Sequence, residues 1–270
     1  MHINVLSLDS GRLLVNAEFL ALLRANGVNS AEALWSLGGD IVKRVLKERG
    51  TERAVLSDSI TGAQVEVYLK RYTRRPLREV IKSAFSLKFK NFGAFEEWDS
   101  LLAFHEAGLP TLPPIAVAKC KAGDCGLTLG VQGFTRASEL YPQLKTDAAR
   151  RRALIAKTAS LAASMHKEGM AHQDFYLVHL FIMPGDKLLL IDLQRMFRQK
   201  ALALRWVVKD LGQLMFSAKP NAQPGDVALF LRVYAKGRGL KLDELKALVK
   251  HCAAKAETIS RHDAKRAKKS

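Results

Sequence analysis

The sequence predicts an α+β protein of two lobes, a small lobe built on an antiparallel sheet and a larger, mainly helical lobe. Short segments with strand character lie in the first half of the chain, at 41–47, 54–58, 65–72 and 127–132. The long apolar-periodic segment 151–168 then stops at Gly169 and predicts a helix. With 270 residues, of which 48% are hydrophobic, the chain can form two lobes with substantial cores.

The N-terminal region is expected to be helical. Residues 16–26 carry apolar side chains at helical spacing before Gly27, and Ser30 can cap a second helix that ends near Gly38 and Gly39. The expected organisation is a helical extension at 1–35, a small lobe at 36–132, a large lobe at 133–258 and a basic tail at 259–270.

The small lobe is expected to begin with three antiparallel strands and one helix. Turns at 49–51 and 61–62 would join the strands, because each contains a glycine. A helical pattern covers 95–106, and the strand at 127–132 leads to Gly133, the expected hinge. In the large lobe, further helices are expected at 206–216, 226–235 and 242–256.

Two aspartates flank a predicted β-hairpin in the large lobe. Asp174 precedes the apolar segment 177–182, and Asp192 ends the apolar run 188–191. Turn residues at 183–186 separate the two runs. The hairpin would therefore carry one carboxylate at each open end.

The residues around these aspartates resemble a known family of kinases. His172-Gln173-Asp174 begins the string His-x-Asp-x-Tyr-x-x-His-Leu-Phe-Ile, and Leu-Ile-Asp-Leu-Gln-Arg follows at 190–195. Together they resemble the lipopolysaccharide core heptose kinases of Gram-negative bacteria, which belong with the kinases of the inner-core Kdo sugar to one wider family. The resemblance covers about 35–234. It implies a two-lobed protein-kinase-like fold, with ATP and Mg²⁺ used to phosphorylate a sugar hydroxyl, most often of a heptose.

The resemblance implies distinct roles in the large lobe. Asp174 would be the general base that orients the acceptor hydroxyl, and Asp192 would bind Mg²⁺. His179 stands where most kinases carry a metal-binding Asn, so the number of metal ions stays open. His172 and Asp210 would support the catalytic loop from behind.

The resemblance also implies the nucleotide-binding residues. Lys70 would hold the ATP phosphates and Glu97 would hold Lys70, although Glu96 lies next to it on the same predicted helix. Gln132 and Phe134, on either side of the hinge, would contact the nucleotide. Gln173 replaces the usual Arg that receives an activation-loop phosphate, so switching by such phosphorylation is not expected.

The net charge of +17 predicts an anionic partner. The segment 70–90 is unusually basic and predicts an amphipathic helix after Pro76, which could lie on an anionic membrane or could simply be solvated on its basic side. The basic residues proposed for the membrane or substrate surface are Arg74, Arg75, Arg78 and Lys82. The lipopolysaccharide core–lipid A acceptor would be met there, and a small acidic protein partner is also admissible. Nucleic acid is not expected, because no segment resembles a nucleic-acid-binding module.

Cysteine usage and the N-terminus bear on location. Three cysteines cannot make a full disulfide framework, and Cys120 and Cys125 flank an expected hairpin tip without further zinc ligands nearby. Residues 1–15 contain no basic segment leading into a long apolar core, so no secretory signal is expected. The expected location is the cytoplasm, peripheral on the inner membrane.

Two other functions remain open. An atypical protein kinase would share the catalytic residues, although the Tyr-x-x-His run after Asp174 fits it less well. A non-catalytic basic binding protein would explain only the charge.

Overall fold

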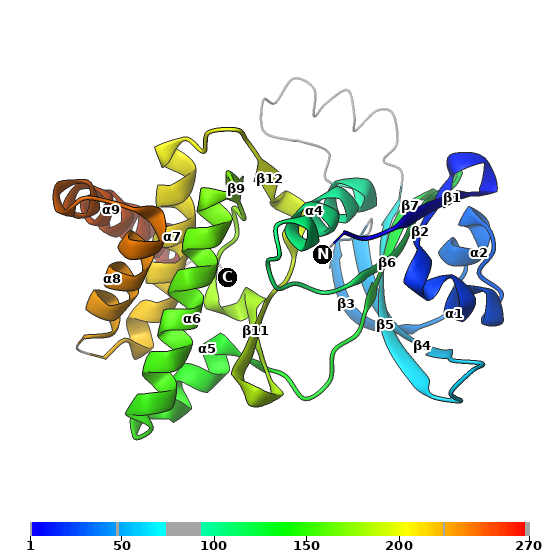
Figure 1. Ribbon diagram of the computed structural model, residues 1–270, viewed down its shortest axis with the longest axis horizontal. Coiled ribbons are helices and arrows are strands. Elements are labelled where there is room, and N and C mark those ends of the chain that lie inside the picture. Colours follow the sequence, from blue (N-terminus) through cyan, green and yellow to red (C-terminus); the bar gives the residue numbers. More distant parts are fainter. Residues whose placement is uncertain (1, 47–48, 74–92, 224, 268–270) are drawn as a thin grey trace. The chain divides into compact units, whose positions relative to one another are not determined.

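Strands dominate the first half of the chain and helices the second, as Figure 1 shows. The computed structural model describes residues 2–46, 49–73, 93–223 and 225–267, without the side chains of 42–46 and 49. The chain divides into two compact units, Met1–Gln132 and Gly133–Ser270. The predicted α+β class, with a sheet lobe and a helical lobe, is confirmed.

An antiparallel sheet of seven strands forms the first unit. The strands are β1 (Val5–Leu8), β2 (Leu13–Asn16), β3 (Asp40–Leu46), β4 (Arg49–Ser57), β5 (Gln64–Thr73), β6 (Pro114–Lys119) and β7 (Gly123–Leu129). Their order in the sheet is β1-β2-β6-β7-β5-β4-β3, and every neighbouring pair is antiparallel. The three strands predicted at 41–47, 54–58 and 65–72 are therefore present as β3, β4 and β5.

The prediction of a helical extension at 1–35 is wrong in its first half. Strands β1 and β2 join the sheet, and only then do a 3-10 turn (Ala17–Phe19), α1 (Leu20–Ala25) and α2 (Ala31–Trp35) follow. Leu13 and Val15 are fully buried on one face of the sheet, while Leu14 packs on the other. Because both faces are covered, the sequence of β2 does not alternate between apolar and polar residues. The predicted helix stop and cap are confirmed: Gly27 has φ +74° and the Ser30 hydroxyl accepts a hydrogen bond from Ala33 N–H.

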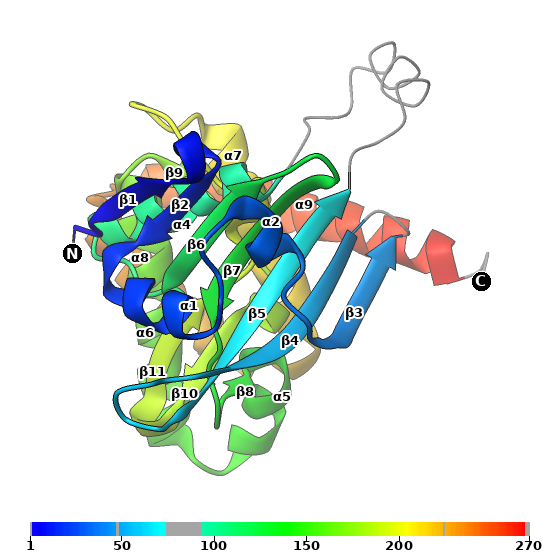
Figure 2. The same ribbon diagram turned by 90° about the vertical axis from the view of Figure 1, so that its right-hand side faces the viewer.

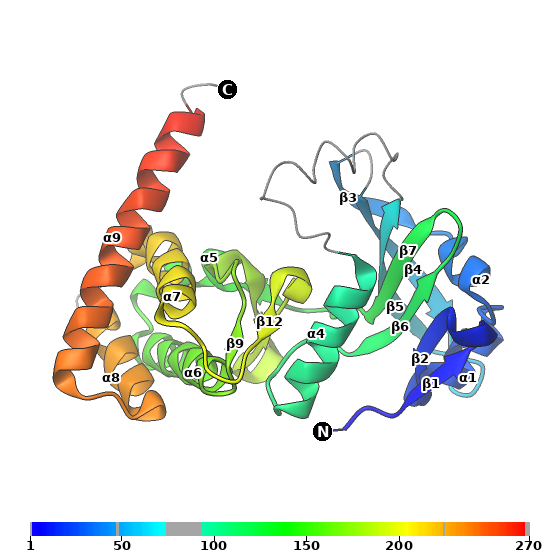
Figure 3. The ribbon, with the colours of Figure 1, turned by 90° about the horizontal axis from the view of Figure 1, so that it is seen from above.

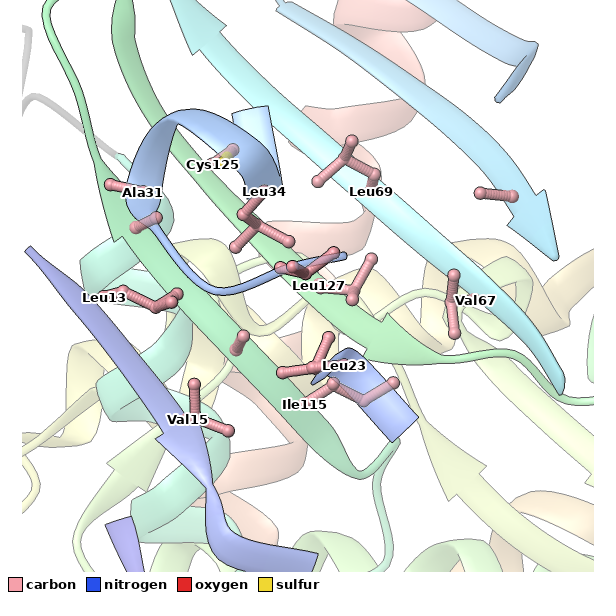
Figure 4. Packing of buried hydrophobic residues seen from close by; sticks show 14 of the residues in the cluster. Leu13, Val15, Leu23, Ala31, Leu34, Val67, Leu69, Ile115, Cys125 and Leu127 are labelled. Atoms are coloured by element: carbon pink, nitrogen blue, oxygen red, sulfur yellow. The ribbon is translucent and has the colours of Figure 1, made fainter. Parts of the chain in front are cut away.

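Helices cover both faces of this sheet. Figure 2 shows α1 and α2 over one face, and Figure 4 shows their side chains, Leu23 and Leu34 among them, packed on the sheet. Helix α4 (Ala94–Glu106) covers the other face through Trp98, which packs with Val117 of β6. Strand β6 is therefore buried on both faces, which explains why its apolar residues run without alternation.

The two predicted turns of this sheet have different outcomes. The turn at 61–62 is confirmed, because Gly62 has φ +70° and its N–H donates to Asp58 C=O. The turn at 49–51 is wrong: these residues belong to β4, where Gly50 pairs with Arg44 of β3 and with Arg71 of β5. Here glycine is tolerated inside a strand that is paired on both sides.

The second unit is a group of long helices with short strands. The helices are α5 (Ala137–Leu140), α6 (Ala148–Lys167), α7 (Leu204–Ala218), α8 (Asp226–Arg238) and α9 (Leu242–Ala267), and Figure 3 shows α9 beside α7. A cavity of about 530 Å³, lined mainly by apolar side chains, lies among the last four of these helices. Buried Arg151 ties the unit together through Tyr141 C=O, Asn221 C=O and the Asp226 carboxylate.

The expected basic tail at 259–270 is wrong up to Ala267, because α9 continues to that residue. Good helix formers and the Glu257–Arg261 pair at 3.1 Å, one turn apart, favour this continuation. Among the described residues, no helix combines the length and apolar character needed to cross a bilayer.

Candidate active site

Two strand pairs join the chain around Asp174 to the chain around Asp192. Strand β9 (Met170–Ala171) precedes the first aspartate and pairs with β12 (Phe197–Arg198), which follows the second. The predicted hairpin is confirmed as β10 (Leu180–Met183) and β11 (Lys187–Leu190), with Gly185 in its turn at φ +73°. At the open end of the hairpin, Ile191 N–H donates to His179 C=O at 3.0 Å. Both sides of the site are therefore fixed by backbone hydrogen bonds.

Asp210 of α7 holds the loop that carries Asp174. Its carboxylate is fully buried and accepts hydrogen bonds from the backbone N–H groups of His172 (2.8 Å) and Gln173 (2.7 Å). His166 lies 3.4 Å from the same carboxylate. Gln173 adopts φ +69°, a left-handed conformation that costs energy for a residue with a side chain. The Asp210 contacts oppose this cost and set the direction of the next residue, Asp174.

His172 is a neutral, buried connector between the two aspartate segments. Its Nδ1 accepts the backbone N–H of Asp174 at 3.2 Å, so the ring proton lies on Nε2, which donates to Ile191 C=O at 3.0 Å. Burial lowers the pKa of His172, and the nearby Asp210 carboxylate opposes this shift. The ring therefore holds Asp174 and Ile191 in place and carries no charge at neutral pH.

The Asp174 carboxylate contacts a residue that the sequence did not assign to the site. Arg195 Nη1 lies 3.1 Å from each of the two Asp174 oxygens. The carboxylate is about one quarter exposed, so it remains open to solvent. Arg195 is the last residue of the string at 190–195. A charged residue three positions after a candidate metal ligand does not by itself indicate a site residue, so the sequence alone offers no reason to single it out.

His179 and Asp192 face one another on the other side of the loop. Because Asp174 C=O can only accept, His179 Nδ1 donates to it at 2.7 Å, and the other ring nitrogen lies 3.8 Å from Asp192 Oδ2. A carboxylate oxygen and an imidazole lone pair at this separation can share a cation. Mg²⁺ is commonly held by one or two carboxylates together with substrate phosphates, so Asp192 fits it well and His179 less well. In the described part of the chain, no cluster of three or more potential metal ligands occurs.

Besides its N–H bond to Asp210, Gln173 ties the loop that carries Asp174 to its surroundings by three further hydrogen bonds. Its side-chain amide donates to Arg195 C=O, its side-chain oxygen accepts from Lys209 Nζ at 3.2 Å, and its backbone C=O accepts from Gln213 Nε2 at 2.7 Å. Burial, together with Arg195, lowers the pKa of Lys209. Protein kinases commonly use a phosphate to hold this region, whereas Gln173 holds it here directly.

In the first unit, Lys70 and Glu97 form the predicted pair. Lys70 Nζ on β5 lies 2.5 Å from Glu97 Oε1 on α4, and Tyr72 OH donates to the other carboxylate oxygen at 3.3 Å. The neighbouring Glu96 accepts the backbone N–H of Gly93 at 2.8 Å and so caps the start of α4. The structure therefore resolves the one-residue ambiguity: Glu97 pairs with Lys70 and Glu96 does not.

The remaining candidate residues differ in their surroundings. Phe134 stacks on Phe181 of β10, with ring centroids 3.8 Å apart and an angle of 7° between the planes. Gln132 is exposed at the end of the first unit. The four basic candidates, Arg74, Arg75, Arg78 and Lys82, lie outside the described residues.

Comparison with known protein families shows which family the chain belongs to. The model of the lipopolysaccharide kinase (Kdo/WaaP) family matches residues 32–234, which include every described candidate above. The chain belongs to the lipopolysaccharide kinase (Kdo/WaaP) family.

The relatives of this lipopolysaccharide kinase cover most of its length. The lipopolysaccharide core heptose(I) kinase WaaP of Pseudomonas aeruginosa is 28% identical over 231 residues, 77% of this chain and 81% of that protein. The protein of the same name from Escherichia coli K12 is 28% identical over 219 residues, 73% of this chain and 78% of its own. Among solved structures, the Toxoplasma gondii rhoptry antigen kinase domain matches with a TM-score of 0.45 and 12% identity, over 80% of this chain and 81% of that domain.

Proposed function

We propose that this chain uses ATP and Mg²⁺ to phosphorylate a heptose hydroxyl of the lipopolysaccharide inner core. The relatives whose names specify this substrate match about three quarters of the chain. The observation that carries the proposal is the placement of Asp174: Asp210 holds the loop that carries it, and its backbone C=O is linked through the His179 ring to Asp192. A base and a metal-binding carboxylate in one rigid frame suit phosphoryl transfer, which depends mainly on positioning and electrostatics.

In the proposed reaction, Asp174 hydrogen-bonds the acceptor hydroxyl and orients its oxygen toward the γ-phosphorus of ATP. The new O–P bond forms, the bond from the γ-phosphorus to the bridging oxygen breaks, and the proton passes to Asp174. The products are a sugar phosphomonoester and ADP. Lys70, oriented by Glu97, holds the ATP phosphates. Asp192, with His179 beside it, would hold Mg²⁺, which neutralises charge on the transferred phosphate.

The proposal is tested by transfer of label from [γ-³²P]ATP to purified lipopolysaccharide. Lipopolysaccharide from a strain that lacks this protein should be labelled by the wild-type enzyme and not by Asp174→Asn. The matched acceptor comes from a strain that also lacks core heptose, and it should stay unlabelled. Equal labelling of both acceptors would refute a heptose acceptor. Labelling of neither acceptor, with label found on added protein, would favour an atypical protein kinase.

We also propose that the protein works as a peripheral protein on the cytoplasmic face of the inner membrane. The net charge of +17 supports this, since each basic residue near an anionic surface adds about 1 kcal/mol of attraction. The protein should cosediment with vesicles rich in anionic lipid, and salt should release it, because exposed charges are screened over about 8 Å at physiological ionic strength. Replacing the four basic candidates of segment 74–82 by Glu should weaken this binding. Binding only to a small acidic protein, or only to nucleic acid, would refute the membrane proposal.

A further inference from the structure

We propose that Arg195 is a positioning residue, which sets the orientation of the Asp174 carboxylate for phosphoryl transfer. This inference rests on the proposed function, because it assigns Asp174 as the base. Its starting point is that one guanidinium nitrogen, Arg195 Nη1, lies 3.1 Å from both carboxylate oxygens. The carboxylate torsion of aspartate is soft, so a neighbour that contacts both oxygens restricts the rotation of the group.

The backbone of Arg195 is held by the same loop that carries Asp174. Gln173, directly before Asp174, donates its side-chain amide to Arg195 C=O. Arg195 then returns its own side chain to Asp174. The contacts form a closed ring of three residues, in which Arg195 cannot move far without disturbing the loop. Such a ring serves orientation, since the base must be placed within a fraction of an ångström of its working position.

Arg195 also links the base to the segment after Asp192. It lies in the 3-10 turn Leu193–Arg195 that starts immediately after Asp192. Asp174 and the Asp192 segment are therefore joined twice, through His179 on one side and Arg195 on the other. Displacement of the turn would remove the guanidinium from Asp174. The base would then take its working orientation only when the Asp192 segment is in place.

A second pair in the same unit provides a matched control. Arg150 contacts the Asp186 carboxylate through Nε and Nη2 at 2.9–3.1 Å, beside the hairpin turn. The side chains of this pair are 43% and 25% exposed, against 48% and 24% for Arg195 and Asp174. Pairs so exposed contribute little to folding stability. If charge pairing and stability were all that mattered, Arg150→Gln and Arg195→Gln would behave alike.

The test compares Arg195→Gln, Arg195→Lys and Arg195→Ala with Arg150→Gln in the lipopolysaccharide labelling assay. Arg195→Gln should lower kcat about 10- to 100-fold, the scale of a misplaced catalytic group, with both KM values within about threefold of wild type. Arg195→Lys should recover part of the loss. Added guanidinium ion should raise the kcat of Arg195→Ala and leave that of Arg150→Gln unchanged. Thermal midpoints of the two Gln variants should agree.

Three results would overturn the inference. One is a kcat for Arg195→Gln within twofold of wild type. Another is a raised KM for the acceptor with unchanged kcat, which would make Arg195 an acceptor-binding residue. The third is a much lower thermal midpoint than for Arg150→Gln without rescue by guanidinium, which would leave a structural role alone. Failure of the proposed function is distinct, because the wild-type protein itself would then label no lipopolysaccharide.

Discussion

The ion pair in the first unit allows a quantitative prediction. Lys70→Ala removes the cation that lies 2.5 Å from Glu97, whose side chain is 9% exposed. Breaking a fully buried pair costs about 3–5 kcal/mol, and breaking an exposed pair about 0–1 kcal/mol. The Lys70 side chain is 18% exposed, so we expect an intermediate loss of about 1–3 kcal/mol in the free energy of unfolding.

The double variant should be less unstable than the sum of the two single variants. Lys70→Ala leaves the Glu97 carboxylate nearly buried, with Tyr72 OH still donating to it, and Glu97→Ala then removes that charge. The coupling energy should therefore be about 1–2 kcal/mol, as found for residues in direct contact. For activity, each single variant should lose about 10²- to 10³-fold in kcat, the scale of one removed electrostatic contact, and the double variant little more.

The assay is urea unfolding together with phosphate transfer for all four members of the cycle. Glu96→Ala is the matched control, because Glu96 lies on the same helix turn but caps Gly93. It should cost about 0.5–1 kcal/mol of stability as a lost cap and leave kcat near wild type. Additive losses of activity for Lys70→Ala and Glu97→Ala would refute the reasoning. So would a larger loss of kcat from Glu96→Ala than from Glu97→Ala.

Three further predictions concern the second unit and the thiols. Asp174→Asn and Asp192→Asn should each abolish phosphate transfer. The thermal midpoint should shift by only a few degrees, because both side chains are partly exposed. Near-normal turnover of either variant would remove the role assigned to that residue. Burial lowers the pKa of His172, so as pH falls below about 6.5 the unfolded chain binds a proton at this residue before the folded chain does. Protonation of His172 should therefore lower the free energy of unfolding by at most about 1.4 kcal/mol per pH unit in this range. His172→Asn should flatten the pH dependence of the unfolding midpoint. Burial raises the pKa of Cys125 and of Cys252 to about 12, so neither thiol should react with Ellman's reagent at pH 8 until the protein unfolds; rapid reaction of the native protein would contradict their burial.

The elements that the sequence predicted correctly have one exposed and one buried side, or clear stops. Helix α6 ends before Gly169, and the β10–β11 hairpin turns at Gly185, both at positive φ. The strands that were missed, β1, β2 and β6, give weaker signals. In β2 and β6 consecutive residues are buried because helices cover both faces of the sheet, so no alternation of period two appears. The partners of such strands are set by tertiary contacts that local patterns do not contain.

The site residues also divide into those that a local sequence pattern reveals and those that only tertiary contacts bring to the site. Asp174, Asp192, Lys70 and Glu97 could be proposed because their spacing resembles a family pattern, and their roles remain predictions. Arg195 could not be found in this way. Its contact with Asp174 spans 21 residues and depends on the pairing of β9 with β12. Gln213 and Lys209 were missed for the same reason, since only the packing of α7 on the loop brings them to Gln173.

The start of α4 bears on how an inhibitor could distinguish this enzyme from protein kinases. Many protein kinases are controlled by displacement of the helix that carries the glutamate of the Lys–Glu pair, and compounds can exploit the displaced state. In this chain the first turn of α4 is anchored at successive residues, by Glu96 to Gly93 and by Glu97 to Lys70 and Tyr72. The Asp124 carboxylate also accepts a hydrogen bond from the backbone N–H of Ala94. A drug that needs the helix pushed aside would have to break all of these contacts, so compounds that accept the assembled pair are the better starting point.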